Sequence, residues 1–148
     1  MLHPAPTDRI DPGLTRGTLE ATHEQTATRP AYLELGLYNS DYRLHLIPLN
    51  EITAKVGKRI VGVIRAEAKR VDIVRSGGKY VEPVMGRPRR VQGRVGEIDN
   101  ARNTITVDAN AVVVCRLTDH RQRASDFEPG QFVSFDVLSG ATFEQSTS

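Results

Sequence analysis

The sequence RIVGVIRAEAKRVDI, residues 59–73, gives the clearest indication of the fold class, because apolar residues recur at every second position along most of its length. Alternation of this kind predicts a β-strand with one buried face. The main apolar positions are even between Ile60 and Ala68, and they become odd from Val71 onward. A bulge or a bend near Lys69 explains the change, since one extra residue moves all later side chains to the opposite face. We therefore predict one long strand that is interrupted at this point.

Shorter strands are predicted on both sides of this stretch. Residues 32–38 and 44–49 alternate in the same way around a polar turn, which predicts a hairpin. The sequence Ser-Gly-Gly at residues 76–78 predicts a second hairpin, between strands at 71–75 and 79–84. Glycine supports this prediction because it tolerates the positive φ of tight turns.

Four more strands are predicted toward the C-terminus, at residues 91–98, 105–109, 111–117 and 131–138. The third of them is a continuous apolar run, so we expect it to be buried on both faces. Residues 50–57 predict one or two helical turns. With about seven or eight strands, hardly any helix and frequent glycine turns, we expect an all-β fold. The expected architecture is a small antiparallel barrel, closed or partly open.

Composition divides the chain into three parts. Residues 1–30 contain four of the eight prolines and have no sustained period, so we expect a flexible, disordered N-terminal tail. Residues 31–143 carry the alternating pattern and are expected to form a single barrel domain. Residues 144–148 are polar and are expected to end the chain outside that domain.

Several segments resemble parts of OB-fold barrels. Residues 57–64, GKRIVGVI, look like the strand with which OB-fold domains begin. Residues 91–99, followed by 103–107, are similar to the first hairpin of many small β-barrels, and residues 128–137 resemble their closing strand. The resemblance implies an OB-like barrel, a fold that commonly binds oligonucleotides or oligosaccharides. A fold does not determine a function, so the implication is limited to these ligand classes.

Little in the sequence indicates catalysis, a cofactor or a metal. Serine nucleophile elbows, phosphate loops and dinucleotide fingerprints are absent, and the four histidines are scattered. The single cysteine, Cys115, excludes an internal disulfide and a multi-cysteine zinc site within the chain. No stretch approaches the roughly 18 apolar residues of a membrane helix, and the N-terminus lacks the pattern of a signal peptide. We therefore expect a non-enzymatic, cytoplasmic protein that needs neither cofactor nor membrane.

Positive charge is concentrated in one part of the chain. The net charge of the whole chain is only +2. Residues 55–94 hold 12 basic and three acidic residues, a local net charge of +9, and the remainder has a net charge of −7. The predicted second hairpin and the loop after it would gather much of this charge into one patch. The candidate binding residues are Lys69, Arg70, Arg75, Lys79, Tyr80, Arg87, Arg89, Arg90 and Arg94.

Such a patch most commonly meets the phosphate backbone of a nucleic acid. Arg89 and Arg90 follow Pro88 and predict a rigidly presented pair for phosphate, and Tyr80 is the aromatic residue available to stack on a base. We therefore predict a binding module that contacts DNA or RNA through residues 69–94. The alternative is a protein-interaction or self-assembly module, in which the same surface meets an acidic protein or the acidic face of another copy. A barrel that holds a small ligand is the third reading.

Overall fold

The computed structural model describes residues 13–75 and 77–146, which form an all-β fold. The one short helix in this part of the chain is the 3-10 turn η2 (Ala124–Asp126), and no helix here could cross a membrane. The strands are β1 (Leu14–His23), β2 (Tyr32–Leu37), β3 (Arg43–Pro48), β4 (Arg59–Ala68), β5 (Val71–Ile73), β6 (Tyr80–Glu82), β7 (Met85–Gly86), β8 (Arg90–Asp99), β9 (Thr104–Asp108), β10 (Val112–Leu117), β11 (Phe132–Asp136) and β12 (Leu138–Gln145).

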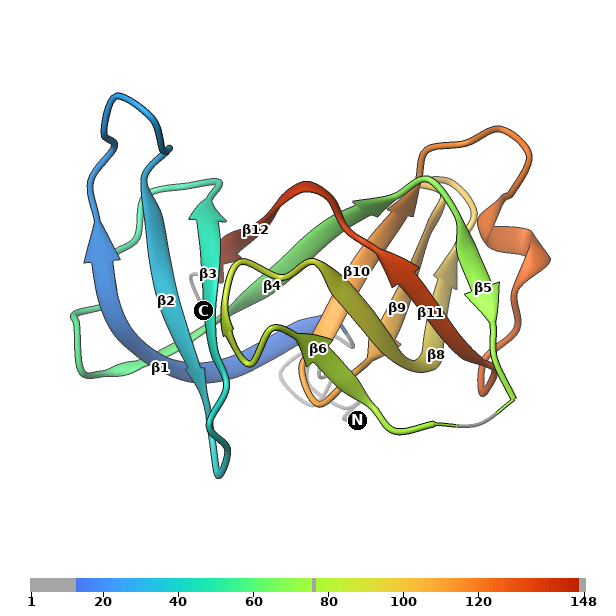
Figure 1. Cartoon of the computed structure of the whole chain (residues 1–148), viewed down its shortest axis with the longest axis horizontal. Coiled ribbons are helices and arrows are strands. Elements are labelled where there is room, and N and C mark those ends of the chain that lie inside the picture. Colours follow the sequence, from blue (N-terminus) through green and yellow to red (C-terminus); the bar gives the residue numbers. More distant parts are fainter. Residues whose placement is uncertain (1–12, 76, 147–148) are drawn as a thin grey trace, which may run out of the picture.

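Five of these strands close into a small barrel of mixed direction. The ring runs β1–β2–β3–β12–β4 and returns to β1 through the antiparallel β1–β4 pairing. The β3–β12 pairing is parallel, and the other pairings of the ring are antiparallel. This barrel occupies the left half of Figure 1, where β1, β2 and β3 curve past one another.

The remaining long strands form the right half of Figure 1. They extend from β4 in the order β4–β10–β9–β8–β11–β5, with β4 and β10 parallel. Since β5 follows β4 directly after a bend at residues 69–70, this row of strands returns to the segment from which it starts. The strand β6 pairs with β8, and β7 pairs with β3 of the first barrel. The ten-residue strand β4 is therefore common to both halves.

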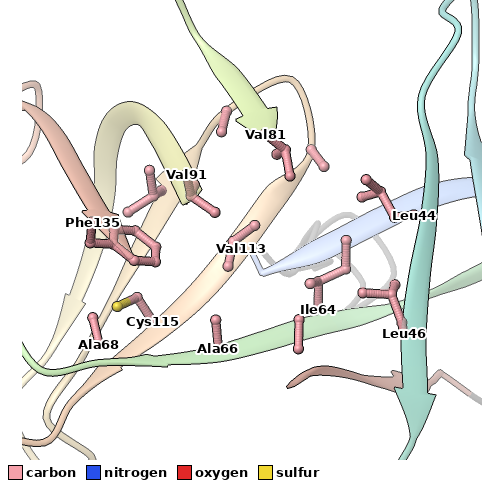
Figure 2. Close-up of a cluster of buried hydrophobic side chains, with 14 of the residues drawn as sticks. Leu44, Leu46, Ile64, Ala66, Ala68, Val81, Val91, Val113, Cys115 and Phe135 are labelled. Carbon is pink, nitrogen blue, oxygen red and sulfur yellow. The ribbon is translucent and has the colours of Figure 1, made fainter. Parts of the chain in front are cut away.

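One apolar core continues through both halves. The buried side chains of β4 alternate with half-buried ones, as its sequence predicts. Figure 2 shows Ile64 of β4 among Leu44 and Leu46 of β3 on the barrel side. Farther along the same strand, Ala66 is the parallel-sheet partner of Cys115 in β10, and all five residues belong to one buried cluster. The bend at residues 69–70 agrees with the predicted interruption, since Val71 after it is again buried.

The structure corrects the prediction of a tail over residues 1–30. Residues 14–23 form β1, and residues 1–12 lie outside the described part of the chain. The period was missed because two inward positions of β1 carry Thr15 and Gly17 rather than large apolar residues. The Thr15 hydroxyl donates to the Val112 carbonyl at 3.0 Å, and a Cβ on Gly17 would lie 2.4 Å from the Gly36 oxygen. Neither the buried hydrogen bond of Thr15 nor the close backbone approach at Gly17 produces an apolar pattern in the sequence.

The prediction of a second hairpin around residues 76–78 is wrong. The two short strands of that region have different partners, because β5 pairs with β11 and β6 pairs with β8. The Val74 amide donates to the Phe132 carbonyl at 2.8 Å, which carries the chain along β11 before it leaves for β6. Glycine therefore permits a wide connection here and not a tight turn. In contrast, the β2–β3 pairing confirms the hairpin predicted from residues 32–38 and 44–49.

Three other expectations change. The barrel is mixed and not antiparallel, the described residues contain twelve strands in place of the seven or eight expected, and residues 50–57 form no helix. The segments that resemble an OB barrel are also distributed differently. Residues 91–107 and 128–137 lie largely in the right half of the molecule, whereas the closed five-stranded ring uses β1, β2, β3, β4 and β12. The antiparallel expectation fails because long connections bring β10 beside β4 and β12 beside β3, and local alternation contains no signal for either partner.

Candidate anion-binding site

The structure distributes the nine predicted binding residues over several surfaces. Since β5 and β6 do not pair, no single hairpin holds them together. Their places are the β4–β5 bend (Lys69, Arg70), the segment after β5 (Arg75), the start of β6 (Lys79, Tyr80), the β7–β8 loop (Arg87, Arg89) and β8 (Arg90, Arg94).

Carboxylates neutralise three of these basic side chains. The pairs are Arg70–Asp72, Lys79–Asp108 and Arg90–Asp136, with N···O distances of 2.8, 2.7 and 2.6 Å. Two of the three carboxylates come from the acidic remainder of the sequence, on β9 and β11. Arg94 donates to the Gly130 carbonyl at 3.0 Å, and the Tyr80 hydroxyl donates to Gln92 at 3.2 Å. Three of the eight positive charges predicted to form a patch are therefore compensated by carboxylates, and the other five form no salt bridge with a described residue.

Arg87 and Arg89 lie close together on the β7–β8 loop. Both are exposed, and neither forms a salt bridge with any described residue. Pro88 between them is buried and anchors the loop. Since alternate residues of an extended segment share a side, the buried proline leaves both arginines facing away from the core together. Arg90 lies on the other side with Asp136, so the predicted Arg89–Arg90 pair is divided between two surfaces.

The two arginines line a hollow with a volume of about 520 Å³. A third arginine, Arg29 of the β1–β2 loop, lines it as well and also has no salt bridge within the described residues. Its guanidinium lies 4.4 Å from the centroid of the Tyr32 ring, a cation–π geometry. The other lining residues are Thr28, Pro30, Tyr32, His45, Ile47 and Pro83. We call this cavity with its three arginines the arginine hollow.

The rings of His23, Tyr32 and His45 form a stacked column on the outer face of β1, β2 and β3. The ring centroids of His23 and Tyr32 are 4.4 Å apart, and those of Tyr32 and His45 are 4.8 Å apart, both stacked. Sheet register explains the column, because His23 and Tyr32 are direct cross-strand partners and His45 faces Glu34, two residues along β2. The column gives the hollow one rigid wall.

Glu34 holds this wall in place from the same face of β2. Its two carboxylate oxygens accept from His23 Nε2 at 2.5 Å and from Arg43 Nε at 2.6 Å. Burial raises the pKa of Glu34, but the hydrogen bonds from His23 and Arg43 outweigh burial and lower this pKa overall. Glu34 is therefore ionised at neutral pH, and both of its oxygens are already engaged. It does not compensate the three arginines.

His45 is the end of the column on β3, and it also lines the hollow. Its Nε2 is 4.0 Å from Glu34 Oε1, beyond hydrogen-bond distance, and its side chain is 21% exposed. Burial lowers the pKa of His45, and the nearby cations Arg29 and Arg43 lower it further, while Glu34 acts in the opposite direction. At neutral pH this imidazole is uncharged, so the positive charge of the hollow comes from its arginines.

The arrangement is suited to binding an anion. Guanidinium groups present paired donors that match the oxygens of phosphate or carboxylate. Within the described residues no cluster of His, Cys, Asp or Glu could hold a metal ion. Cys115 is buried, and burial, with a smaller contribution from Glu67, raises its pKa to about 12, so its thiol is a packing group. No protein-family model, curated protein or solved structure matches this chain.

The sequence predicted two of the nine residues that line the hollow, Arg87 and Arg89, and among the seven others are the functional side chains Arg29, Tyr32 and His45. Arg29 falls in the region predicted to be a tail. Tyr32 and His45 lie on the correctly predicted hairpin, but their stacking depends on strand register. A signal was nevertheless present: alternation puts Tyr32 on the outward face of one strand, and the polar His45 occupies an alternating position on the next.

Proposed function

We propose that this chain is a non-catalytic binding module that contacts the phosphate backbone of a nucleic acid through the arginine hollow. The observation that carries the proposal is the convergence of Arg29, Arg87 and Arg89 on one cavity without a carboxylate partner among the described residues. Three uncompensated guanidinium groups repel one another, and a polyanion relieves that repulsion while releasing its own counterions.

The position of the hollow on the barrel supports the same ligand class. In chain order the barrel strands are β1, β2, β3, β4 and β12, and the hollow lies on the second and third of them. Arg29 comes from the loop between the first and second strands, and Arg87 and Arg89 come from the segment between the fourth and fifth. OB-fold barrels bind oligonucleotides on the face of strands 2 and 3 and through these two connections. We therefore propose that the five-stranded barrel is OB-like and that it binds nucleic acid on the corresponding face.

The test compares two triple variants that remove the same charge. Arg29, Arg87 and Arg89 are replaced by Ala in the first variant. The control replaces Arg65, Arg116 and Arg121, each of which already forms a salt bridge with a carboxylate. Binding to a labelled oligonucleotide is measured by fluorescence anisotropy at about 50–150 mM salt, where phosphate contacts are strong. We expect the first variant to bind at least about tenfold more weakly, given three charge-assisted contacts, and the control to bind nearly as the unmodified chain does.

Equal losses in the two variants, or no binding by the unmodified chain, would contradict the proposal. An excess of unlabelled polyglutamate identifies the alternative, an acidic protein partner. If polyglutamate displaces the oligonucleotide at an equal concentration of charge, the hollow does not prefer phosphate. Sedimentation at low and high salt detects self-assembly of the chain, which the same alternative predicts to be salt-sensitive.

A further inference from the structure

The wall of the arginine hollow contains an imidazole, the side-chain type whose ordinary pKa lies closest to neutral pH. His45 lines the hollow together with the three arginines. The other groups around it come from four elements: His23 on β1, Arg29 on the β1–β2 loop, Tyr32 and Glu34 on β2, and Arg43 on β3. Arg29 and Arg43 are cations, Arg87 and Arg89 add two more at the hollow, and Glu34 is the one anion among these groups. An added proton on His45 therefore enters surroundings that are already positive.

Glu34 is the only carboxylate among these groups, and its geometry limits what it can do for His45. Its oxygens are engaged by His23 and Arg43 at 2.5 and 2.6 Å, whereas His45 Nε2 remains 4.0 Å away. A protonated His45 thus lacks a hydrogen-bonded anionic partner among the described residues. An anion held by the arginines would supply that partner.

We propose that His45 makes the arginine hollow a pH-dependent site, which binds nucleic-acid phosphate more tightly as the pH falls and His45 takes up a proton. The inference rests on the proposed function and adds its regulation. Binding and protonation are linked reciprocally: if the proton strengthens phosphate binding, bound phosphate must strengthen proton binding by the same factor. One additional charge in contact with phosphate supplies the coupling.

The experiment measures the affinity of oligothymidylate with a free 5′ hydroxyl between about pH 5.5 and 8, the range in which histidine changes its charge. This probe is chosen because neither its phosphodiesters nor its bases titrate there. The unmodified chain is compared with His45→Gln, and His120→Gln is the matched control, since His120 is 95% exposed and lies away from the hollow. We expect about three- to tenfold tighter binding at the acidic end, a coupling of up to one pKa unit. His45→Gln should abolish this dependence and His120→Gln should keep it.

Binding that does not vary with pH, or a dependence that survives in His45→Gln, overturns the inference and leaves the proposed function intact. Absence of binding at every pH overturns the proposed function itself. A second measurement uses the unmodified chain and does not depend on the folding of a variant. The imidazole signals of His45 are followed by NMR through a pH titration with and without the oligonucleotide. A rise of the His45 pKa on binding supports the inference, and an unchanged pKa contradicts it.

Discussion

At the scale of single residues, the site depends on where charge is compensated and where it is not. Asp72, Asp108 and Asp136 each accept from a basic side chain that the sequence placed in one patch. Surface pairs of this kind contribute only about 0–1 kcal/mol to stability. Their larger effect is on the surface potential, since they leave Arg87 and Arg89 as uncompensated charges at the hollow. These three ion pairs therefore remove part of the predicted patch and leave the arginines of the hollow charged.

Glu34 is the residue on which the wall of the hollow most depends. Its side chain is 14% exposed and accepts from His23 and Arg43, so Glu34→Gln removes a charge from two hydrogen bonds. We expect the free energy of unfolding at pH 7 to fall by about 1–3 kcal/mol, as measured by urea unfolding. Because the folded pKa of Glu34 is lowered below 4.5, its contribution is complete above that value. It is lost as the pH falls through the lower, folded pKa.

The difference in the free energy of unfolding between the unmodified chain and Glu34→Gln should therefore become smaller as the pH is lowered from neutral to strongly acidic values. Glu144→Gln is the matched control, because Glu144 also accepts from an arginine but is 46% exposed. Its loss should cost less than about 1 kcal/mol. If Glu34→Gln proves as mild as the control, or its cost is independent of pH, Glu34 does not hold the wall.

At the scale of elements, β1 and β4 determine the architecture. One edge of β4 pairs with β1 over residues 59–63 and then with β10 over residues 64–68, while the other edge pairs with β12. A single strand thus provides edges to both halves. Without β1 the five-stranded ring would be open, and neither β2 nor the loop that carries Arg29 would have its neighbour. The hollow therefore requires β1 even though only its flanking loop lines the cavity.

Leu19 tests whether β1 is part of the core. Its side chain is fully buried, so Leu19→Ala should lower the free energy of unfolding by about 2–5 kcal/mol. Thr22→Ala lies on the same strand but is exposed, and it should change stability by no more than about 0.5 kcal/mol. Both values are obtained from urea unfolding followed by circular dichroism. If the two substitutions have the same effect on stability, β1 is not part of the core, and the segment behaves as the tail that the sequence predicted.

At the scale of the whole molecule, the hollow is built from both halves. The strands β2 and β3 belong to the closed barrel, whereas Pro83, Arg87 and Arg89 lie between β6 and β8. The short strand β7 joins the two parts, because it pairs with β3 next to the loop that carries the arginines. In Figure 1 this segment crosses between the halves beside β3. The hollow therefore forms only when both halves of the molecule are folded and in contact.

Local alternation predicted many of the strands, including β4 with its interruption and the β2–β3 hairpin. It could not predict pairing between distant segments. Nothing in the sequence near Ile73 indicates that β5 meets β11, because a strand's partner depends on packing over the whole chain. For the same reason, only two of the nine residues that line the hollow were predicted. Arg29 and Arg87 are 58 positions apart in the sequence, and they line the same cavity only once β1 has paired with β2 and β7 has paired with β3.

Whether phosphate binds in the arginine hollow is tested by the salt dependence of oligonucleotide binding, measured for the unmodified chain and for the triple variant in which Arg29, Arg87 and Arg89 are replaced by Ala. Each phosphate contact contributes about 0.7 to the slope of log affinity against log salt for a single strand. The account predicts that the slope becomes shallower by about 2 in the triple variant. It predicts no such change in the Arg65, Arg116 and Arg121 control. An unchanged slope in the hollow variant would show that phosphate binds elsewhere and would contradict the account.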